Sequence, residues 1–421
     1  MLDLKFIRDN PDLVRAGVAK KKATADIDGI LRLDLQRREL LAEVERLRAE
    51  RNRVSEIVAG KKKAKESADR EIQEMRQVGD QIAQLDRSLR ELEDNLHTAL
   101  IWVPNLPHES APVGTDESAN VVVRQWGEIP RPQFKVLPHW EIGEKLGIVD
   151  LPAAARVAGS GFYLLRGAGA RLQRALINFM LDLHAADGFT ECVAPYIVTA
   201  DAMFGTGQLP KLADDMYRIE KDNTYLIPTG EVPLTNLFRN EILSYQQLPV
   251  YLVAHTPCFR REAGAAGKDT RGMLRVHQFD KVELVKIVRP EHSYDELESL
   301  VRQAEKVIQQ LNLPYRICEL ATGDLTFAST KCYDIELWAA GVEKYLEVSS
   351  ISIFEDFQAR RMNCRFRDHD KSIRFPHTLN GSGVALARLI AAILENYQNA
   401  DGSITIPDIL RHYFGGAATI F

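Results

Sequence analysis

Charged and aromatic side chains alternate along one stretch of the chain in a way that suits a nucleotide. Arg260 and Glu262 are two residues apart, and so are Phe279, Lys281 and Glu283. In an extended strand, residues at this spacing share one face. A guanidinium binds phosphate, an aromatic ring offers a stacking surface for a base, and a carboxylate accepts a hydrogen bond from an exocyclic amine. The same residues also fit a solvated sheet face held by ion pairs, so the chemistry alone leaves both interpretations open.

Other common catalytic and ligand motifs are missing from the sequence. No GxxxxGK[ST], GxSxG or HExxH occurs, and Gly167-Ala-Gly169 lacks the third glycine of a dinucleotide fingerprint. The five cysteines are scattered and form no zinc-like group with histidine. Such a sparse set predicts a reducing compartment, so we expect a cytoplasmic protein. No apolar run reaches the roughly 18 residues of a spanning helix, so no membrane partner is expected.

The first hundred residues carry the pattern of two long helices. Apolar residues recur every seven positions in 27–58 and again in 66–100. Sustained heptads predict a coiled coil, and the lysine-rich stretch 60–65 predicts the turn of an antiparallel hairpin. Residues 31–65 carry a net charge of +5 and residues 66–100 a net charge of −5, so the two helices should attract each other. A plain oligomerisation coiled coil with solvated charges is the competing interpretation.

The distribution of charge bears on nucleic-acid binding. The formal net charge of the whole chain is −5, which mildly disfavours a polyanionic partner. Binding depends on local charge, however, and the first helix with the lysine-rich stretch presents a basic surface that the total hides. The hairpin therefore remains a candidate nucleic-acid surface.

The rest of the chain predicts a separate mixed domain. Prolines at positions 104 and 107 end the second helix, and residues 106–138 are polar and irregular. Beyond them we expect helices over 170–184, 290–311 and 383–397, and strands over 225–228, 250–256, 274–287, 315–320 and 345–353. This irregular alternation favours an α+β fold with an antiparallel sheet flanked by helices. We therefore expect an N-terminal domain with a coiled-coil arm over 1–105, a linker over 106–138 and a catalytic domain over 139–421.

The order of these features resembles the bacterial-type seryl-tRNA synthetases, which belong to class II. Phe259-Arg-Arg-Glu262 with His277-Gln-Phe-Asp-Lys-Val-Glu283 is similar to motif 2 of that class, and Asn380-Gly-Ser-Gly-Val-Ala-Leu-Ala-Arg388 is similar to motif 3. Gly188-Phe-Thr-Glu-Cys-Val-Ala-Pro195 is similar to motif 1, whose proline implies a homodimer. With the preceding arm, the resemblance extends from Met1 to near Tyr413.

The resemblance implies a role for each matching residue. The implied serine contacts are Thr229, Gly230, Glu231, Glu283, Asn380 and Ser382. The implied ATP contacts are Arg260, Arg261, Glu262, Phe279, Glu347, Val348, Ser349, Ser350 and Arg388, with Arg260 and Arg388 as the catalytic pair. Glu347 and Ser350 match the segment that contacts Mg²⁺ through ATP, although their opposite parity requires a bulge if both face the nucleotide. The implied tRNA-binding residues of the arm are Lys61, Lys62 and Lys63.

The implied activity is that of a serine–tRNA ligase. Such an enzyme forms seryl-adenylate from serine and ATP and transfers serine to the 3′ end of tRNA-Ser, and of tRNA-Sec where that tRNA is present. Two alternatives stay open: a small-amino-acid ligase with a non-tRNA acceptor, and an inactive coiled-coil scaffold. The intact arm argues against the first alternative. The presence of Arg260, Glu262, Glu283 and Arg388 argues against the second.

Overall fold

The computed structural model describes residues 1–263 and 271–421. Its contacts divide the chain into two compact units. One unit consists of residues 2–19 and 23–104, and the other consists of residues 105–421 together with Met1 and residues 20–22. The helical hairpin and the mixed region that the sequence predicts therefore belong to different units.

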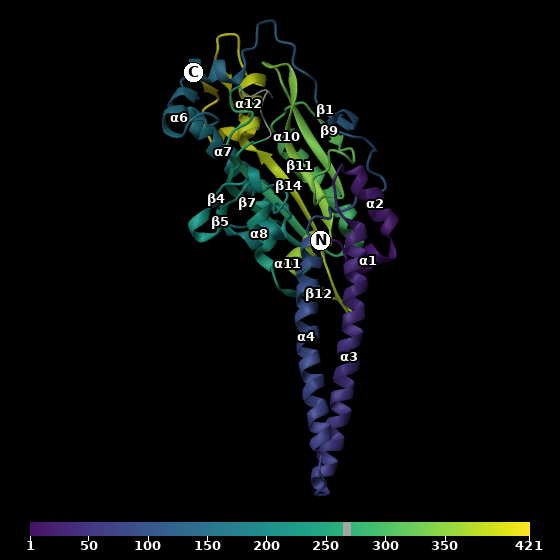
Figure 1. Ribbon diagram of the computed structural model, residues 1–421. Coiled ribbons are helices and arrows are strands. Elements are labelled where there is room, and N and C mark those ends of the chain that lie inside the picture. The colour runs from purple at the N-terminus through teal and green to yellow at the C-terminus, as the bar shows by residue number, and fades with distance from the viewer. Residues whose placement is uncertain (264–270) are drawn as a thin grey trace. The chain divides into compact units, whose positions relative to one another are not determined.

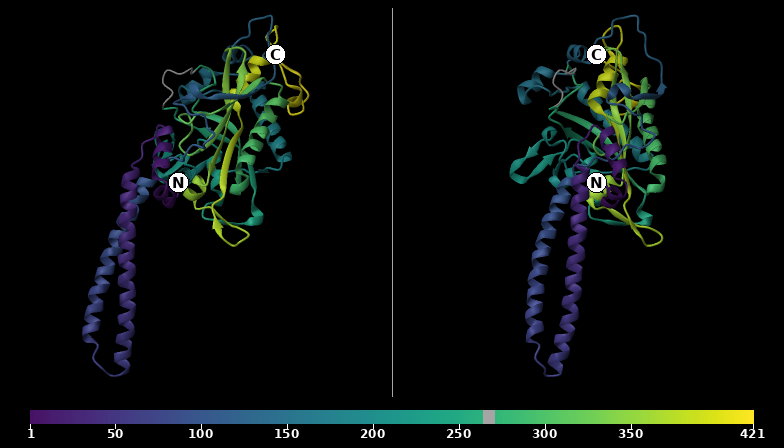
Figure 2. Two further views of the ribbon diagram at one scale, coloured as in Figure 1. Left: turned by 90° about the vertical axis from the view of Figure 1, so that its right-hand side faces the viewer. Right: turned by 45° about the vertical axis from the view of Figure 1, so that its right-hand side comes forward.

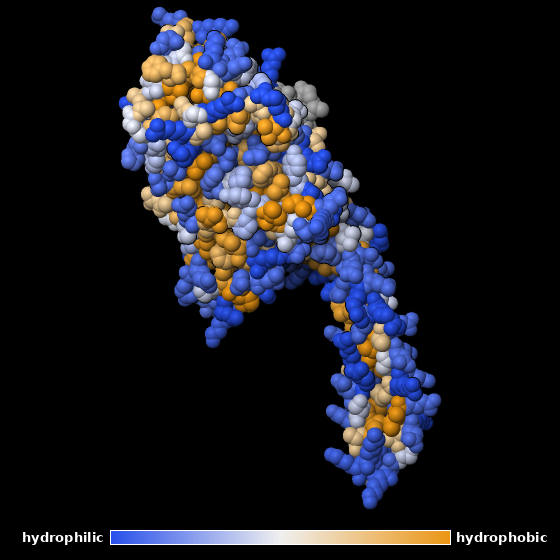
Figure 3. Space-filling model, turned by 90° about the vertical axis from the view of Figure 1, so that its left-hand side faces the viewer, coloured by the Kyte–Doolittle hydropathy of each residue, from blue (hydrophilic) through white to orange (hydrophobic). Residues whose placement is uncertain are grey.

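The hairpin unit is built on two long helices, α3 (Ile27–Lys63) and α4 (Asp69–Leu100), which lie side by side (Figure 1). The Asp26 side chain accepts a hydrogen bond from the Gly29 N–H at 2.8 Å and so caps α3. The heptad residues Val44, Leu47 and Ile82 are buried. Figure 3 shows hydrophobic side chains along the middle of the arm with hydrophilic ones on either side. Two shorter helices, α1 (Leu4–Asp9) and α2 (Pro11–Lys20), precede the hairpin.

Ion pairs join α3 to α4. The basic residue of each pair lies on α3 and the acidic residue on α4, as the opposite net charges of the two segments predict. Arg37 Nε lies 3.0 Å from Glu93 Oε1, and Arg48 Nη2 lies 3.0 Å from Asp86 Oδ1. The predicted turn is wrong by a few residues, because Lys61–Lys63 form the last turn of α3 and the chain reverses over 64–68. The helix continues there because lysine is a good helix former and is favourable near a helix C-terminus.

The second unit is organised around one eight-stranded sheet with the strand order β1-β9-β10-β11-β14-β8-β7-β2. All neighbours in it are antiparallel except β2 and β7. The antiparallel α+β fold expected from the sequence is therefore confirmed. The strands are β1 (Val121–Trp126), β2 (Thr190–Glu191), β7 (Val250–Phe259), β8 (Gln278–Val288), β9 (Tyr315–Glu319), β10 (Lys331–Ala339), β11 (Lys344–Glu355) and β14 (His377–Ala385).

Smaller elements complete this unit. Two three-stranded sheets have the orders β13-β12-β6 and β3-β5-β4, and β15 pairs with β16. Their strands are β3 (Ile197–Thr199), β4 (Arg218–Ile219), β5 (Thr224–Leu226), β6 (Ile242–Ser244), β12 (Arg365–Arg367), β13 (Ile373–Arg374), β15 (Ile404–Thr405) and β16 (Thr419–Ile420). The short helices are α5 (His139–Lys145), α6 (Leu151–Ala158), α8 (Ala200–Gly205), α9 (Glu231–Thr235), α11 (Phe357–Met362) and α13 (Asp408–Arg411).

Alternation along the central strands separates an apolar core from a polar face. Val282 and Leu284 of β8 and Ile351 of β11 belong to the main core. That core also contains residues of α7 (Ala168–Ala186), α10 (Ser293–Gln310) and α12 (Leu386–Asn396), and Figure 2 shows α10 running along the strands. The intervening residues Lys281 and Ser350 line a cavity instead. At these positions the period-two pattern assigns α7, α10 and α12 to one face of the sheet and the cavity to the other. Farther along β8, Val285 and Ile287 on the cavity face pack in a second apolar cluster with residues of α9 and α11.

Several predicted element boundaries are wrong. The stretch expected to be an irregular linker contains β1, which forms an edge of the large sheet by pairing with β9. The helix expected over 383–397 begins at Leu386, because the preceding residues through Ala385 are the end of β14. The glycine-rich part of that segment is consequently the end of a strand and not the start of the helix. Small residues allow β14 to lie in the middle of the sheet, where a Cβ on Gly381 would stand 3.0 Å from Ile351.

No helix in the described ranges, 1–263 and 271–421, is both long enough and apolar enough to cross a membrane.

Candidate active site

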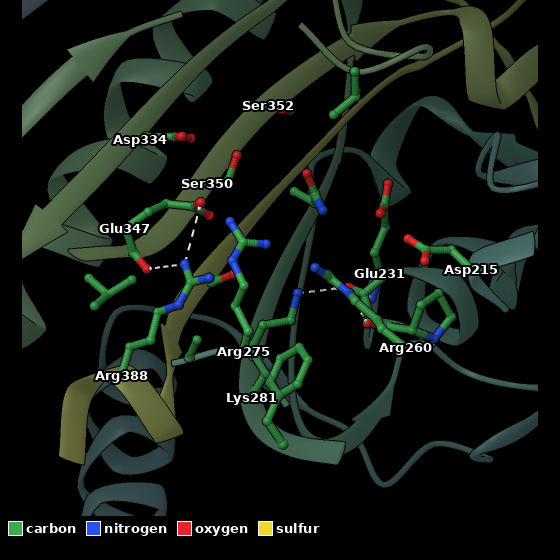
Figure 4. Close-up of a pocket in the computed structure, with 18 of the residues that line it drawn as sticks. Asp215, Glu231, Arg260, Arg275, Lys281, Asp334, Glu347, Ser350, Ser352 and Arg388 are labelled. Carbon is green, nitrogen blue, oxygen red and sulfur yellow. Dashed lines mark hydrogen bonds and ion pairs between the residues drawn. The ribbon is translucent and has the colours of Figure 1, made fainter. Parts of the chain in front are cut away.

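A cavity of about 790 Å³ opens on the polar face of the large sheet. It brings together most of the residues singled out from the sequence. Arg260, which follows β7, and Arg388, in the first turn of α12, both line it, although 128 positions separate them in the chain. In Figure 4 the guanidinium groups of Arg260, Arg275 and Arg388 reach into the same space. The predicted residues that line the cavity are Thr229, Glu231, Arg260, Glu262, Phe279, Glu347, Val348, Ser350, Asn380, Ser382 and Arg388.

Behind one end of the cavity lies Glu283, which is fully buried on β8 and is not itself a lining residue. Its Oε2 accepts a hydrogen bond from Thr229 Oγ1 at 2.9 Å and pairs with the ammonium group of Lys281. Lys281 Nζ also donates to Thr229 Oγ1 at 2.9 Å, so the three groups form a closed triangle. The other carboxylate oxygen accepts from Asn380 Nδ2 at 3.3 Å. Glu283 is thus a buried anion that a buried cation and two hydrogen-bond donors compensate.

Ser382 is placed beside Glu283 by the sheet itself. The two residues are directly opposite each other in the β14–β8 ladder. Ser349 Oγ donates to the Ser382 backbone carbonyl at 2.6 Å and braces this strand from β11. The register of the two strands therefore places Ser382 and Glu283, two predicted serine contacts, side by side on one face of the sheet.

Glu231, at the start of α9, is the second buried carboxylate of this end. Its Oε1 accepts from Gln358 Nε2 at 2.7 Å, and its Oε2 accepts from Gln208 Nε2 at 3.5 Å. Thr378 Oγ1 donates to Gln358 Oε1 at 2.6 Å, which fixes the amide so that its NH₂ group faces Glu231. Burial first, and then the charge of Glu283, raise the pKa of Glu231 to about 7. Glu231 has neutral partners, so the end as a whole is acidic and prefers a cation.

Away from this end the cavity becomes basic, beginning with Arg260, which lies beside Glu231 (Figure 4). Arg260 Nε donates to the Pro228 carbonyl at 3.3 Å, and its guanidinium lies 5.3 Å from the centre of the Phe279 ring. Arg275 Nη1 lies 3.5 Å from Glu262 Oε2. Planar guanidinium groups with free N–H edges suit phosphate oxygens, and the Phe279 ring adds an apolar surface for a base.

Arg260 and Glu262 share the cavity for a different reason from the one expected. The strand β7 ends at Phe259, so strand parity does not align these two residues. Glu262 has a φ of 51°, in the left-handed region, so a turn and not strand alternation sets its position on the cavity wall. The sequence also predicts a loop from about Gly264 to Gly272 between the two strands, and this loop lies largely outside the described residues.

Arg388 is held from two sides. Its Nε donates to the Leu274 carbonyl at 3.1 Å, and its Nη1 donates to the Glu347 carbonyl at 2.5 Å. The same Nη1 lies 3.4 Å from Glu347 Oε2 (Figure 4). A guanidinium held by three acceptors keeps its position before any ligand binds.

The bulge required for Glu347 and Ser350 to face one way is confirmed. In the β10–β11 ladder, Ile335 pairs with Ser349 whereas the next residue, Glu336, pairs with Glu347. Val348 is therefore the extra residue of a β-bulge, which reverses the parity between positions 347 and 350. Both Glu347 and Ser350 line the cavity.

The cluster around Ser350 has the donor chemistry that a hard cation prefers. Asp334 lies opposite Ser350 in the ladder, and burial followed by the charge of Glu347 raises the pKa of Asp334 well above its ordinary value. A cation among these oxygens would relieve that repulsion. No group of three or more acidic, histidine or cysteine side chains in the described part of the chain could bind a metal by itself. The residues therefore fit Mg²⁺ that is held mainly by phosphate oxygens.

Some predicted residues lie off the cavity wall. Arg261 is not among its lining residues, and its guanidinium lies over the Tyr217 ring at 5.8 Å. Gly230 lies behind the wall, where a Cβ would stand 2.9 Å from the Glu283 Cβ, so the residue contributes by leaving room. Ser349 of β11 is buried and is not a lining residue. Lys61–Lys63 belong to the hairpin unit, where Lys61 pairs with Glu71.

Sequence reasoning gave no role to several residues of the cavity. Lys281 is placed by strand parity on the same face as Phe279 and Glu283, but the sequence assigns it no role there. Arg275 stands in the predicted motif 2 segment and carries the charge that the site needs. Gln208 and Gln358 had no detectable signal, because they come from other parts of the chain and only tertiary contacts bring them to Glu231.

Comparison with known protein families agrees with this architecture over both units. The family model of the seryl-tRNA synthetase N-terminal domain matches residues 1–107, and that of the tRNA synthetase class II core domain (G, H, P, S and T) matches residues 216–397. The serine–tRNA ligase of Thermodesulfovibrio yellowstonii is 52% identical over 419 residues, which cover 99% of each chain. That of Carboxydothermus hydrogenoformans is 54% identical over 417 residues, covering 99% of this chain and 98% of the other.

A solved structure extends the similarity to three dimensions. The crystal structure of seryl-tRNA synthetase from Pyrococcus horikoshii complexed with ATP matches with a TM-score of 0.93 at 40% sequence identity. The match covers 100% of this chain and 99% of that one. Family models, full-length relatives and fold all agree, and the chain belongs to the seryl-tRNA synthetase family.

Proposed function

We propose that this chain is a serine–tRNA ligase that activates serine with ATP and esterifies it to tRNA-Ser. One observation carries the proposal: Arg260 and Arg388 line the same cavity as the buried carboxylate of Glu231 and as Thr229, which donates to the buried Glu283 behind it. Phosphate needs positively charged groups and a small ammonium-bearing substrate needs a negatively charged one. This cavity supplies both kinds of group. The ATP bound to the Pyrococcus horikoshii enzyme supports the choice of nucleotide.

The acidic end suits serine because serine is small and carries an ammonium and a hydroxyl group. Glu231 is the uncompensated anion and would hold the ammonium group. Glu283, Ser382 and Thr229 offer hydrogen-bond partners to the hydroxyl. Alanine would be rejected because these buried polar groups would then be left unpaired. Threonine would be rejected by the space that its methyl group requires.

The basic end would perform adenylate formation. The serine carboxylate attacks the α-phosphorus of ATP, the bond to the bridging oxygen breaks, and pyrophosphate leaves. An ionised carboxylate needs no general base. Arg260 and Arg388 would hold the phosphates in line and neutralise charge as it develops, while Phe279 stacks on the base. Mg²⁺ bound through ATP near Glu347 and Ser350 would supply further charge neutralisation.

The second half-reaction would use the hairpin unit. A hydroxyl of the terminal ribose of tRNA attacks the carbonyl carbon of seryl-adenylate, loses its proton and displaces AMP. The arm would hold tRNA through its phosphates and shape, because an RNA duplex hides its base edges in a deep groove. Lys62 and Lys63, exposed in the last turn of α3, would contact phosphates. tRNA-Sec would be a second acceptor where it is present.

We also propose a cytoplasmic homodimer. The segment that follows α7 exposes apolar side chains, with Val193 91% and Ile197 53% accessible. It includes Pro195 and follows directly from β2, which is the last strand of the sheet. Exposed apolar residues at a sheet edge favour a second copy as the covering surface.

Serine-dependent exchange of pyrophosphate into ATP tests the proposal against its alternatives. The chain should catalyse exchange with serine among a panel of amino acids and should charge tRNA-Ser. Exchange with serine but no charging of any tRNA would indicate a ligase with another acceptor. No exchange with any amino acid would indicate an inactive scaffold.

A further inference from the structure

A buried histidine outside the cavity connects two parts of the active-site framework. His139, the first residue of α5, is fully buried and is not among the residues that line the cavity. Its Nδ1 lies 2.7 Å from Glu395 Oε1, and its Nε2 accepts a hydrogen bond from the Met273 backbone N–H at 3.1 Å. An imidazole that donates from one nitrogen and accepts at the other is fixed in one tautomer and one orientation.

Glu395 is a rigid anchor for this histidine. Its Oε1 also accepts from the His139 backbone N–H at 2.9 Å. Its Oε2 accepts from the backbone N–H groups of Gly341 at 2.8 Å and Val342 at 3.1 Å. A buried carboxylate with four donors has no freedom to turn, so it fixes the imidazole that it holds.

The segment that His139 binds belongs to the nucleotide end of the cavity. Met273, Leu274 and Arg275 all line the cavity, and the Leu274 carbonyl accepts from Arg388 Nε at 3.1 Å. Arg388 and Glu395 lie seven residues apart on α12, which is about two helical turns and places them on one side. The helix therefore binds Met273–Leu274 twice, directly through Arg388 and indirectly through Glu395 and His139.

The backbone beside Met273 is adapted to the imidazole. Gly272 has a φ of +69°, and a Cβ there would stand 2.1 Å from His139 Nε2. Glycine is thus required both by the backbone conformation and by the close approach of the ring. The close contact between His139 and this segment therefore restricts position 272 to glycine.

We propose that His139 is a positioning residue for the ATP half of the site. By holding Met273–Leu274, it fixes the guanidinium of Arg388 and the wall that carries Arg275. The inference rests on the proposed function, because it assigns the effect to nucleotide binding. The serine end, built on Glu231 and Glu283, shares no contact with this chain of bonds, so loss of His139 should affect ATP and not serine.

Two substitutions at His139 separate its two bonds. Asparagine places an amide donor near the Nδ1 position, so His139→Asn keeps the bond to Glu395 and loses the acceptor for Met273. Glutamine reaches the Nε2 position, so His139→Gln restores that acceptor. In pyrophosphate exchange, His139→Asn should raise the KM for ATP about tenfold, the effect of one lost buried hydrogen bond, and change the KM for serine less than about twofold. His139→Gln should recover most of the loss.

A matched control removes another histidine hydrogen bond. His377 is half-buried, and its Nδ1 lies 2.9 Å from Ser293 Oγ, with no contact to Met273 or Leu274. His377→Asn should leave both KM values unchanged. Glu395→Gln provides a second way to disturb the anchor and should raise the KM for ATP even if His139→Asn does not fold. Its effect should be less than additive with that of His139→Asn, because both residues act through one chain of contacts.

The outcomes separate the inference from the proposed function. A wild-type protein without serine-dependent exchange would contradict the proposed function. If the wild type is active, an unchanged KM for ATP in folded His139→Asn or Glu395→Gln would overturn the inference alone. Equal increases of the KM values for ATP and serine would also overturn it, because they would indicate a general loss of structure.

Discussion

Gln358 donates a hydrogen bond from Nε2 to Glu231 Oε1 at 2.7 Å, and it is a neutral partner for a buried carboxylate. An amide satisfies the oxygen without cancelling the charge. Lys281, whose charge also acts on Glu231, is already paired with Glu283. The Glu231 carboxylate therefore remains available to pair with a cationic group of the substrate, and the effects of its charge can be measured.

The ionisation of Glu231 should control serine binding near neutral pH. Burial and then Glu283 raise the pKa of Glu231 to about 7, so this carboxyl loses its charge as the pH falls below that value. The ionised fraction falls about tenfold between pH 8 and pH 6, and the affinity for serine should fall with it. Titration calorimetry with serine alone measures this. The weak binding left in Glu231→Gln should not depend on pH in this range, and a flat wild-type profile would contradict the assignment.

The same group should lower the stability of the folded protein at high pH. The folded pKa is raised above the unfolded value, so the unfolded chain ionises first as the pH rises, and stability is lost between about pH 4 and pH 7. Glu231→Gln should therefore be more stable than wild type at pH 8, by up to about 3 kcal/mol. Urea unfolding measures the difference, which should vanish near pH 4. The exposed Glu220→Gln serves as the control and should match wild type at both pH values.

Removal of the Lys281 ammonium should destabilise the protein through Glu283. Lys281→Met leaves a fully buried carboxylate without its cation, which costs about 3–5 kcal/mol. Adding Glu283→Gln removes that charge and should restore most of the stability without restoring serine activation. Urea unfolding and pyrophosphate exchange measure the two effects. Equal stability of the single and double variants would show that the pair does not hold the site together.

Truncation of the arginines proposed to bind phosphate should abolish adenylate formation and spare the fold. Arg260→Ala or Arg388→Ala should lower kcat for pyrophosphate exchange by about 10²-fold or more, because each group stabilises charge that develops in the transition state. Exposed Arg218, which donates to Asn223 Oδ1 at 2.8 Å, provides the control substitution. Circular dichroism verifies folding. Wild-type exchange in Arg260→Ala would defeat the site assignment.

Deletion of the arm should uncouple the two half-reactions. Arg37 and Glu93 pair across the hairpin at 3.0 Å, so residues 38–92 can be replaced by a short flexible turn that starts from an existing contact. Pyrophosphate exchange should persist while tRNA charging falls sharply. The milder change Lys62→Ala with Lys63→Ala should raise the KM for tRNA about tenfold and weaken its salt dependence. Undiminished charging by the deletion variant would make the arm merely structural.

Local repetition in the sequence determined much of this molecule. The heptads of the arm, the charge difference between its helices and the period-two pattern around Phe279 each arise from neighbours along the chain, so spacing alone reveals them. The parity conflict between Glu347 and Ser350 even predicted a bulge that the β10–β11 ladder contains. The resemblance of the motifs to a known family added the identity of the substrates.

Only the tertiary structure decided how distant segments meet. Gln358 joins Glu231, and His139 joins Met273 to Glu395, across more than a hundred residues, and no spacing records such contacts. The glycine-rich end of β14 was misassigned for the same reason, because its place in the middle of a sheet depends on partners elsewhere in the chain. Propensity and period encode local geometry, whereas packing and hydrogen-bond satisfaction are properties of the folded whole.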